Sequence, residues 1–112
     1  MSSRRFFLVV APVIFFTRGA NANEPARFAL RIAGGKLVEG PQVIKLTRNA
    51  AVVLTVVSDT ADELHVHGYN LTLKLVPNQA ATLRFTGKHT GRFSFELHKT
   101  HREIGAFEIY PD

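Results

Sequence analysis

The sequence predicts an all-β fold, a sandwich or barrel of about seven or eight short antiparallel strands. Three observations support this prediction. Short segments in which apolar and polar residues alternate recur along the chain, turn-forming residues separate them, and no segment has the periodicity of a long helix. With 112 residues, of which 46% are hydrophobic and 21% charged, the chain has the composition of a single globular domain.

The N-terminus has the pattern of an export signal. Two arginines precede an apolar core at residues 6–16, and Ala-Asn-Ala at 20–22 offers the small residues that a signal peptidase requires. The core has 11 residues, too few to cross a bilayer of about 30 Å as a stable helix. We therefore expect cleavage after Ala22, a mature domain of residues 23–112 and a periplasmic location.

The route of export has two alternatives. The run Ser-Arg-Arg-Phe-Phe-Leu at 3–8 resembles the twin-arginine motif, which directs the export of folded proteins, often with a cofactor already bound. The strongly apolar core fits an ordinary signal for unfolded export equally well. An uncleaved anchor is a third, weaker alternative.

Composition excludes several classes of function. The chain has no Cys, which excludes disulfide scaffolds, thiol catalysis, iron–sulfur clusters and thiolate-bound copper. Loss of residues 1–22 removes Arg4, Arg5 and Arg18 and no acid, so the net charge falls from +5 to +2. The remaining basic residues are scattered singly, and a nucleic-acid partner is not indicated.

Each expected strand has its own signal. Segment 51–57 is apolar at odd and even positions, which is typical of a strand buried on both faces, whereas the other segments are shorter or alternate. Segment 98–104 is long enough for one turn, and 23–27 is expected to be a loose tail. The expected strands are 28–32, 43–46, 51–57, 69–75, 81–85, 93–97 and 106–110, with Phe28, Phe85, Phe93, Phe95 and Phe107 in the core.

The histidines are the most informative residues. All five lie between positions 65 and 101, and four form the close pairs His65/His67 and His98/His101. Strand side chains alternate, so the first pair shares one face, with Cα atoms roughly 6.6 Å apart. If that strand continues without a bulge at Gly68, both rings share the face of the apolar stripe that follows and point inward.

Two such pairs predict a metal site. A buried imidazole needs a partner for each nitrogen, and two pairs that meet at one end of a sandwich offer three or four nitrogen ligands, which suits copper or zinc. Taken singly, the first pair also fits a structural role at a strand end or solvent-facing residues after a bulge, and the second pair fits an exposed loop. His89 is expected at the surface. The acidic residues available for oxygen ligation, or to orient the rings, are Asp62, Glu63, Glu96 and Glu103.

The order of these motifs resembles the cupredoxin-like domains over roughly residues 28–110. The resemblance is carried by Asp62-Glu-Leu-His65, Gly68-Tyr69 with its leucine strand, and the segments at 77–85, 91–98 and 104–105. It implies a Greek-key β-sandwich with a metal site at one end.

The resemblance also implies which residues stand at the ligand positions. His65 matches the first histidine ligand, and His98 or His101 matches the second. Leu97 stands where the family's Cys would be, and Glu103 or Ile104 where its axial Met would be. A blue-copper site requires that thiolate, so the sequence argues against one.

The function expected from the sequence is that of an exported copper-binding protein, a monomer that takes part in metal carriage or homeostasis. It would bind Cu(II) or Cu(I), and its partner would be a periplasmic or inner-membrane copper or redox protein. An enzyme is not expected, because no Ser–His–Asp order or paired-carboxylate motif is present. The alternative is a metal-free interaction module of a membrane redox or transport complex. The expected metal ligands are His65, His67, His98 and His101, with Glu63, Glu96 and Glu103 beside them.

Overall fold

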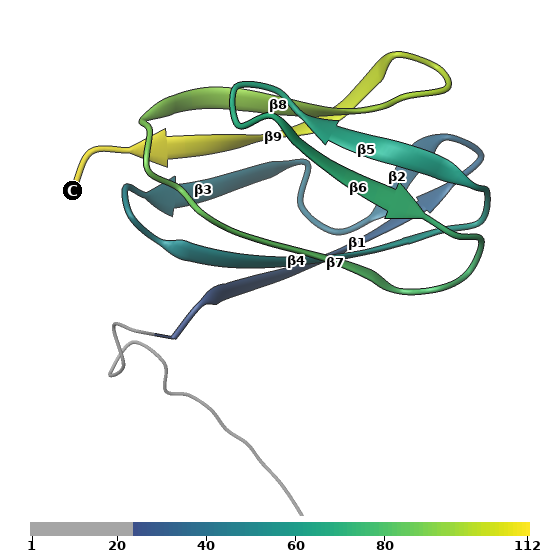
Figure 1. Ribbon diagram of the computed structural model, residues 1–112, viewed down its shortest axis with the longest axis horizontal. Coiled ribbons are helices and arrows are strands. Elements are labelled where there is room, and N and C mark those ends of the chain that lie inside the picture. The colour runs from purple at the N-terminus through teal and green to yellow at the C-terminus, as the bar shows by residue number, and fades with distance from the viewer. Residues whose placement is uncertain (1–23) are drawn as a thin grey trace, which may run out of the picture.

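The computed structural model describes residues 24–112, which form nine β-strands in two stacked sheets (Figure 1). The predicted export signal lies outside the described residues. Among the residues described, no helix is long and apolar enough to cross a membrane. The strands are β1 (Ala26–Ala33), β2 (Lys36–Glu39), β3 (Val43–Thr47), β4 (Ala51–Ser58), β5 (Asp62–Val66), β6 (Leu71–Leu75), β7 (Ala81–Thr86), β8 (Gly91–Leu97) and β9 (Arg102–Tyr110).

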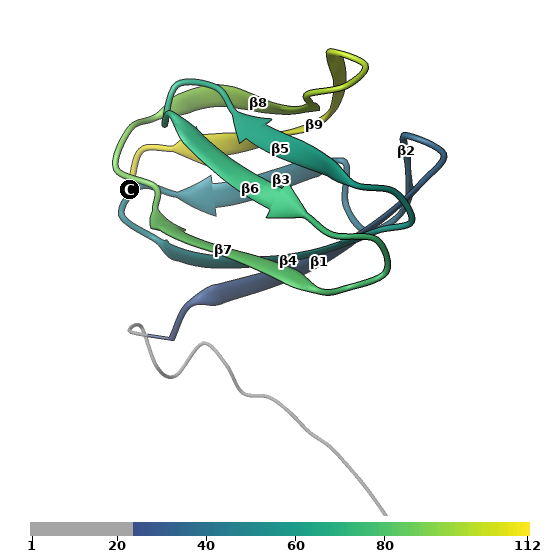
Figure 2. The ribbon, with the colours of Figure 1, turned by 45° about the vertical axis from the view of Figure 1, so that its right-hand side comes forward.

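The two sheets confirm the predicted sandwich. One has the strand order β2-β1-β4-β7 and the other β3-β9-β8-β5-β6, and Figure 2 shows them as two layers. The expectation of purely antiparallel pairing is wrong at two places, because β1 pairs with β4 and β3 pairs with β9 in parallel. After β2 the chain crosses to the second sheet for β3 and returns for β4, which therefore runs in the same direction as β1.

Three segments differ from the prediction. Residues 36–39 and 62–66 are additional strands, and the latter is separate from β6 rather than its beginning. Strand β1 begins at Ala26, so the end of the expected tail belongs to a sheet. The turn expected after β8 covers only 98–101, since β9 begins at Arg102 and pairs with β8. This β8–β9 turn projects from one end of the second sheet, at the upper right of Figure 1.

Aromatic and aliphatic side chains fill the space between the sheets. Phe95 and Phe107 are fully buried with ring centroids 5.2 Å apart, and Phe85 packs edge-on against Phe107 at 5.0 Å. Phe28 and Phe93 are partly buried against the same core. The apolar pattern of β4 predicted a strand buried on both faces, and its valines at 52, 53 and 56 are indeed buried.

Candidate metal centre

The His65 side chain lies on the opposite face of the sheet from the expected one, and His67 lies in the turn that follows β5. On β5 the inward residues are Leu64 and Val66, so the His65 side chain lies on the outer face of the sheet, 32% exposed. The chain turns back at 67–70, where Gly68 has a φ of +85° that favours glycine. Residues paired across two neighbouring strands share a face of the sheet. Because Val66 pairs with Leu71 across this four-residue loop, the inward-facing residues are even-numbered on β5 and odd-numbered on β6.

The turn after β8 is held against the start of β5. The Asp62 carboxylate accepts hydrogen bonds from the backbone N–H of Lys99, at 3.0 Å, and of Glu63, at 2.8 Å. The backbone N–H of His98 donates to the carbonyl of Glu63, at 2.9 Å. Asp62 was expected to orient ligands or to bind metal through oxygen, and the structure shows it fastening the turn that carries His98.

These bonds bring His65 and His98 together. Their ring centroids are 5.2 Å apart, and the Nε2 of His65 lies 3.2 Å from the Glu63 carboxylate. One potential ligand atom from each of Glu63, His65 and His98 lies within 4.8 Å of the others. We call these three residues the inner group. Two chain segments therefore meet as the sequence predicted, although on the outer face of the sheet.

His67 and His101 belong to a different arrangement. The Nε2–H of His67 donates to one oxygen of the Glu96 carboxylate at 2.8 Å, and Nδ1 of His101 lies 3.7 Å from the other oxygen. We call His67, Glu96 and His101 the outer group. Of the three or four nitrogen ligands expected at one site, the described residues bring together two, from His65 and His98. His101 lies beside His98, with ring centroids 5.9 Å apart.

The hydrogen bond from His67 lowers the pKa of Glu96 below its ordinary value of 4.5, with the charges of His67 and His101 acting in the same direction. Because this pKa is lowered on folding, the stabilisation is present above the ordinary glutamate pKa and is lost as the pH falls through the lowered one. We expect His67→Ala to raise the pKa of Glu96, measured by an NMR titration of its carboxyl carbon. His89→Ala serves as the control, and an unchanged Glu96 midpoint in His67→Ala would contradict the assignment.

The remaining candidates have other partners. The Glu103 carboxylate pairs with Arg92, so it is engaged outside both groups. His89 is exposed, as expected, and its backbone N–H donates to the Tyr69 hydroxyl at 2.9 Å. Tyr69 packs edge-on against Phe85 and Phe93, which agrees with a structural role.

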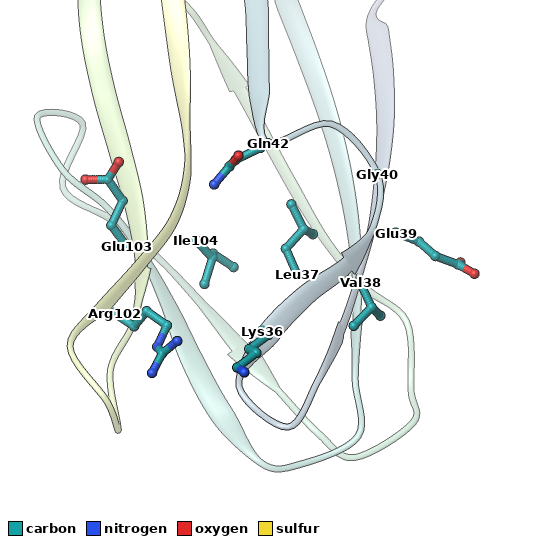
Figure 3. Close-up of a pocket in the computed structure, with 9 residues that line it drawn as sticks. All are labelled: Lys36, Leu37, Val38, Glu39, Gly40, Gln42, Arg102, Glu103 and Ile104. Atoms are coloured by element: carbon teal, nitrogen blue, oxygen red, sulfur yellow. The ribbon is translucent and has the colours of Figure 1, made fainter.

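A hollow of about 440 Å³ lies away from the imidazoles (Figure 3). It lies between β2 and the start of β9, where Leu37 and Ile104 line the gap and Lys36 and Arg102 lie at its rim. It contains no histidine, and its carboxylates, Glu39 and Glu103, are paired with arginines. This hollow therefore lacks a donor set for a metal ion.

Two smaller hollows border the imidazoles. One of about 400 Å³ follows the β5–β6 turn and is lined by His65 and His67 among others. Another of about 270 Å³ lies beside Glu63 and His98. Solvent and small ions can therefore approach the inner group from two sides.

The fold has counterparts among copper proteins. A chain of a heme-copper terminal oxidase dimer superimposes with a TM-score of 0.67 at 17% identity, over 89% of this chain and 76% of its own. A copper binding protein in its apo form gives 0.58 at 14% identity, over 78% of this chain and 98% of its own. The purple cupredoxin from Nitrosopumilus maritimus gives 0.53 at 13% identity, over 75% and 98%. The chain has a cupredoxin-like fold.

The sequence matches no model of a known protein family and no curated protein. At identities of 13–17% the structural likeness shows the fold of this cupredoxin-like chain and nothing of its chemistry. Its lack of Cys excludes the trigonal His₂Cys site of blue copper. Imidazole and carboxylate groups are therefore the main candidate ligands for a metal ion.

Proposed function

We propose that this cupredoxin-like protein is an exported copper-binding protein that carries or stores copper. The inner group is the observation that supports the proposal, because its three ligand atoms lie within 4.8 Å of one another. The export pattern at residues 1–22 supports a periplasmic location. No catalytic role is proposed.

The spacing of the inner group suits one metal ion. Nitrogen and oxygen ligands lie about 2.0–2.2 Å from such an ion, so two ligands of the same ion are at most about 4.4 Å apart. Small rotations of Glu63 and His98 close the remaining gap, and both side chains have room because they lie at the surface. Imidazole and carboxylate bind a metal ion only in their deprotonated forms, so protons compete with the ion and binding weakens at low pH.

The donor set favours copper among divalent ions. Two imidazoles and one carboxylate leave coordination positions open, and Cu(II) is at the top of the affinity order for such ligands. The solved structures that share the fold include an apo copper binding protein and a purple cupredoxin, which is further support for copper. An accessible site with open positions allows a partner to take the ion, as carriage requires.

Titration of the purified protein with Cu(II) tests the proposal. We expect one tightly bound ion per chain, nitrogen coupling in the electron paramagnetic resonance spectrum, and no intense blue absorption because the chain has no thiolate. Metal analysis of protein purified from its native compartment should find copper.

A protein that takes up no copper in either measurement would contradict the proposal. In that case the metal-free interaction module becomes the better account of the fold. Its binding surface would then have to be sought away from the imidazoles, for example at the edge strand β2, where Val38 is 51% exposed.

A further inference from the structure

The outer group differs from the other carboxylate pairs in the described part of the chain. Glu96 has an imidazole at each oxygen, 2.8 Å away on His67 and 3.7 Å away on His101. The carboxylates at 39, 103 and 112 instead pair with arginines, which do not bind metal ions. Glu63 also faces an imidazole, that of His65, whereas Glu96 faces two.

Backbone structure holds this carboxylate and one imidazole in place. Glu96 lies on β8 opposite His65, and the backbone N–H of His67 donates to the Ser94 carbonyl at 2.9 Å. The side chain of Glu96 is only 21% exposed. The side chain of His101 is 77% exposed on the β8–β9 turn, so its ring can swing toward Glu96 at little steric cost.

We propose that His67, Glu96 and His101 form a second site for a divalent cation of the zinc or copper class, distinct from the inner group. The chemistry is that of imidazole nitrogen with carboxylate oxygen, which suits these ions. Its residues differ from those of the inner group, so this site stands or falls independently of the proposed function. Because His101 must move to complete it, it binds more weakly than the inner group.

The two sites lie next to each other. The rings of His98 and His101 are 5.9 Å apart by centroid and belong to the same turn. His98 of the inner group and His101 of the outer group are thus neighbouring candidate ligands on one turn.

Calorimetric titration with Zn(II) tests the second site, because zinc is not reduced or oxidised during the measurement. We expect two equivalents per chain, the second weaker. Glu96→Gln should weaken that second equivalent at least about tenfold and keep the first, since loss of even a group that only orients a ligand typically costs about 10–100-fold in affinity. Histidine ring NMR signals should show the second equivalent shifting His67 and His101.

Matched variants separate the possibilities. Glu103→Gln removes the neighbouring carboxylate, which pairs with Arg92, and should leave both equivalents unchanged. The double variant His65→Ala/His98→Ala should lose the inner equivalent and keep the outer one, so failure of the inner site does not hide the outer. A wild-type protein whose bound zinc never shifts the ring signals of His67 and His101, or a Glu96→Gln variant with unchanged stoichiometry and affinity, would overturn the proposal.

Discussion

Replacing His65 and His98 together by alanine is expected to weaken the tight binding of Cu(II) at least about tenfold, which corresponds to about 1.4 kcal/mol or more. The two rings supply both nitrogen ligands of the inner group, with centroids 5.2 Å apart. Without them only Glu63 remains, and a single exposed carboxylate holds Cu(II) poorly compared with imidazole. The measurement is a competition titration against a chelator of known affinity.

The fold should survive this double change. His65 lies on the outer face of its sheet and His98 is exposed in a turn, so neither fills the core. A circular dichroism spectrum like that of the wild type checks this. His89→Ala is the matched control, since His89 is exposed and lies outside both groups. Retention of full Cu(II) affinity by the double variant would place the copper site elsewhere.

Phe107→Ala is expected to have the largest effect on stability, lowering the free energy of unfolding by about 3–5 kcal/mol. The Phe107 ring is fully buried and packs against Phe95 and Phe85, with centroids 5.2 and 5.0 Å away. Removing it loses the transfer free energy of the ring and leaves a cavity that neighbouring strands cannot close. A domain of this size typically unfolds in the range of about 5–15 kcal/mol, so the loss is a large fraction of the total.

Urea unfolding followed by circular dichroism measures the change. We expect the melting temperature to fall by at least about 12 °C as well. Val38→Ala, at a strand residue 51% exposed, should cost less than about 1 kcal/mol. A loss below about 1 kcal/mol for Phe107→Ala would show that this ring is not part of the tightly packed core.

The strand prediction succeeded where burial leaves a periodic pattern. The double-faced run of β4 and the alternation of Phe93, Phe95 and Leu97 in β8 both reflect a real inner face. Strand β2 gave no such signal, because Leu37 is the one partly buried residue among four. Short edge strands depend on pairing with a neighbour, here β1, and local sequence carries little of that information.

The error at His65 has a specific cause. The inward-facing leucines of β6 are odd-numbered. The prediction assumed one continuous strand from His65 through Tyr69 to these leucines, which would place the odd-numbered histidines on the same inward face. Gly68 and Asn70 both have positive φ values and close a hairpin, so β5 and β6 are separate strands with opposite parity. Glycine and asparagine both favour a positive φ, so a turn predicted at Gly68 and Asn70 would have placed His65 on the outer face of the sheet.

The sequence by itself determined the donor chemistry and the class of fold. Histidines with no cysteine make imidazole and carboxylate the main candidate donors for a metal ion, and alternating strands favour a sandwich or barrel that buries their apolar faces. Only the tertiary structure decided which of these residues meet. The pairing of His65 with His98, and of His67 with Glu96, follows from the antiparallel register of β5 on β8 and from the turn at 98–101. Such register depends on contacts between residues about 30 positions apart, which the local pattern of side chains does not encode.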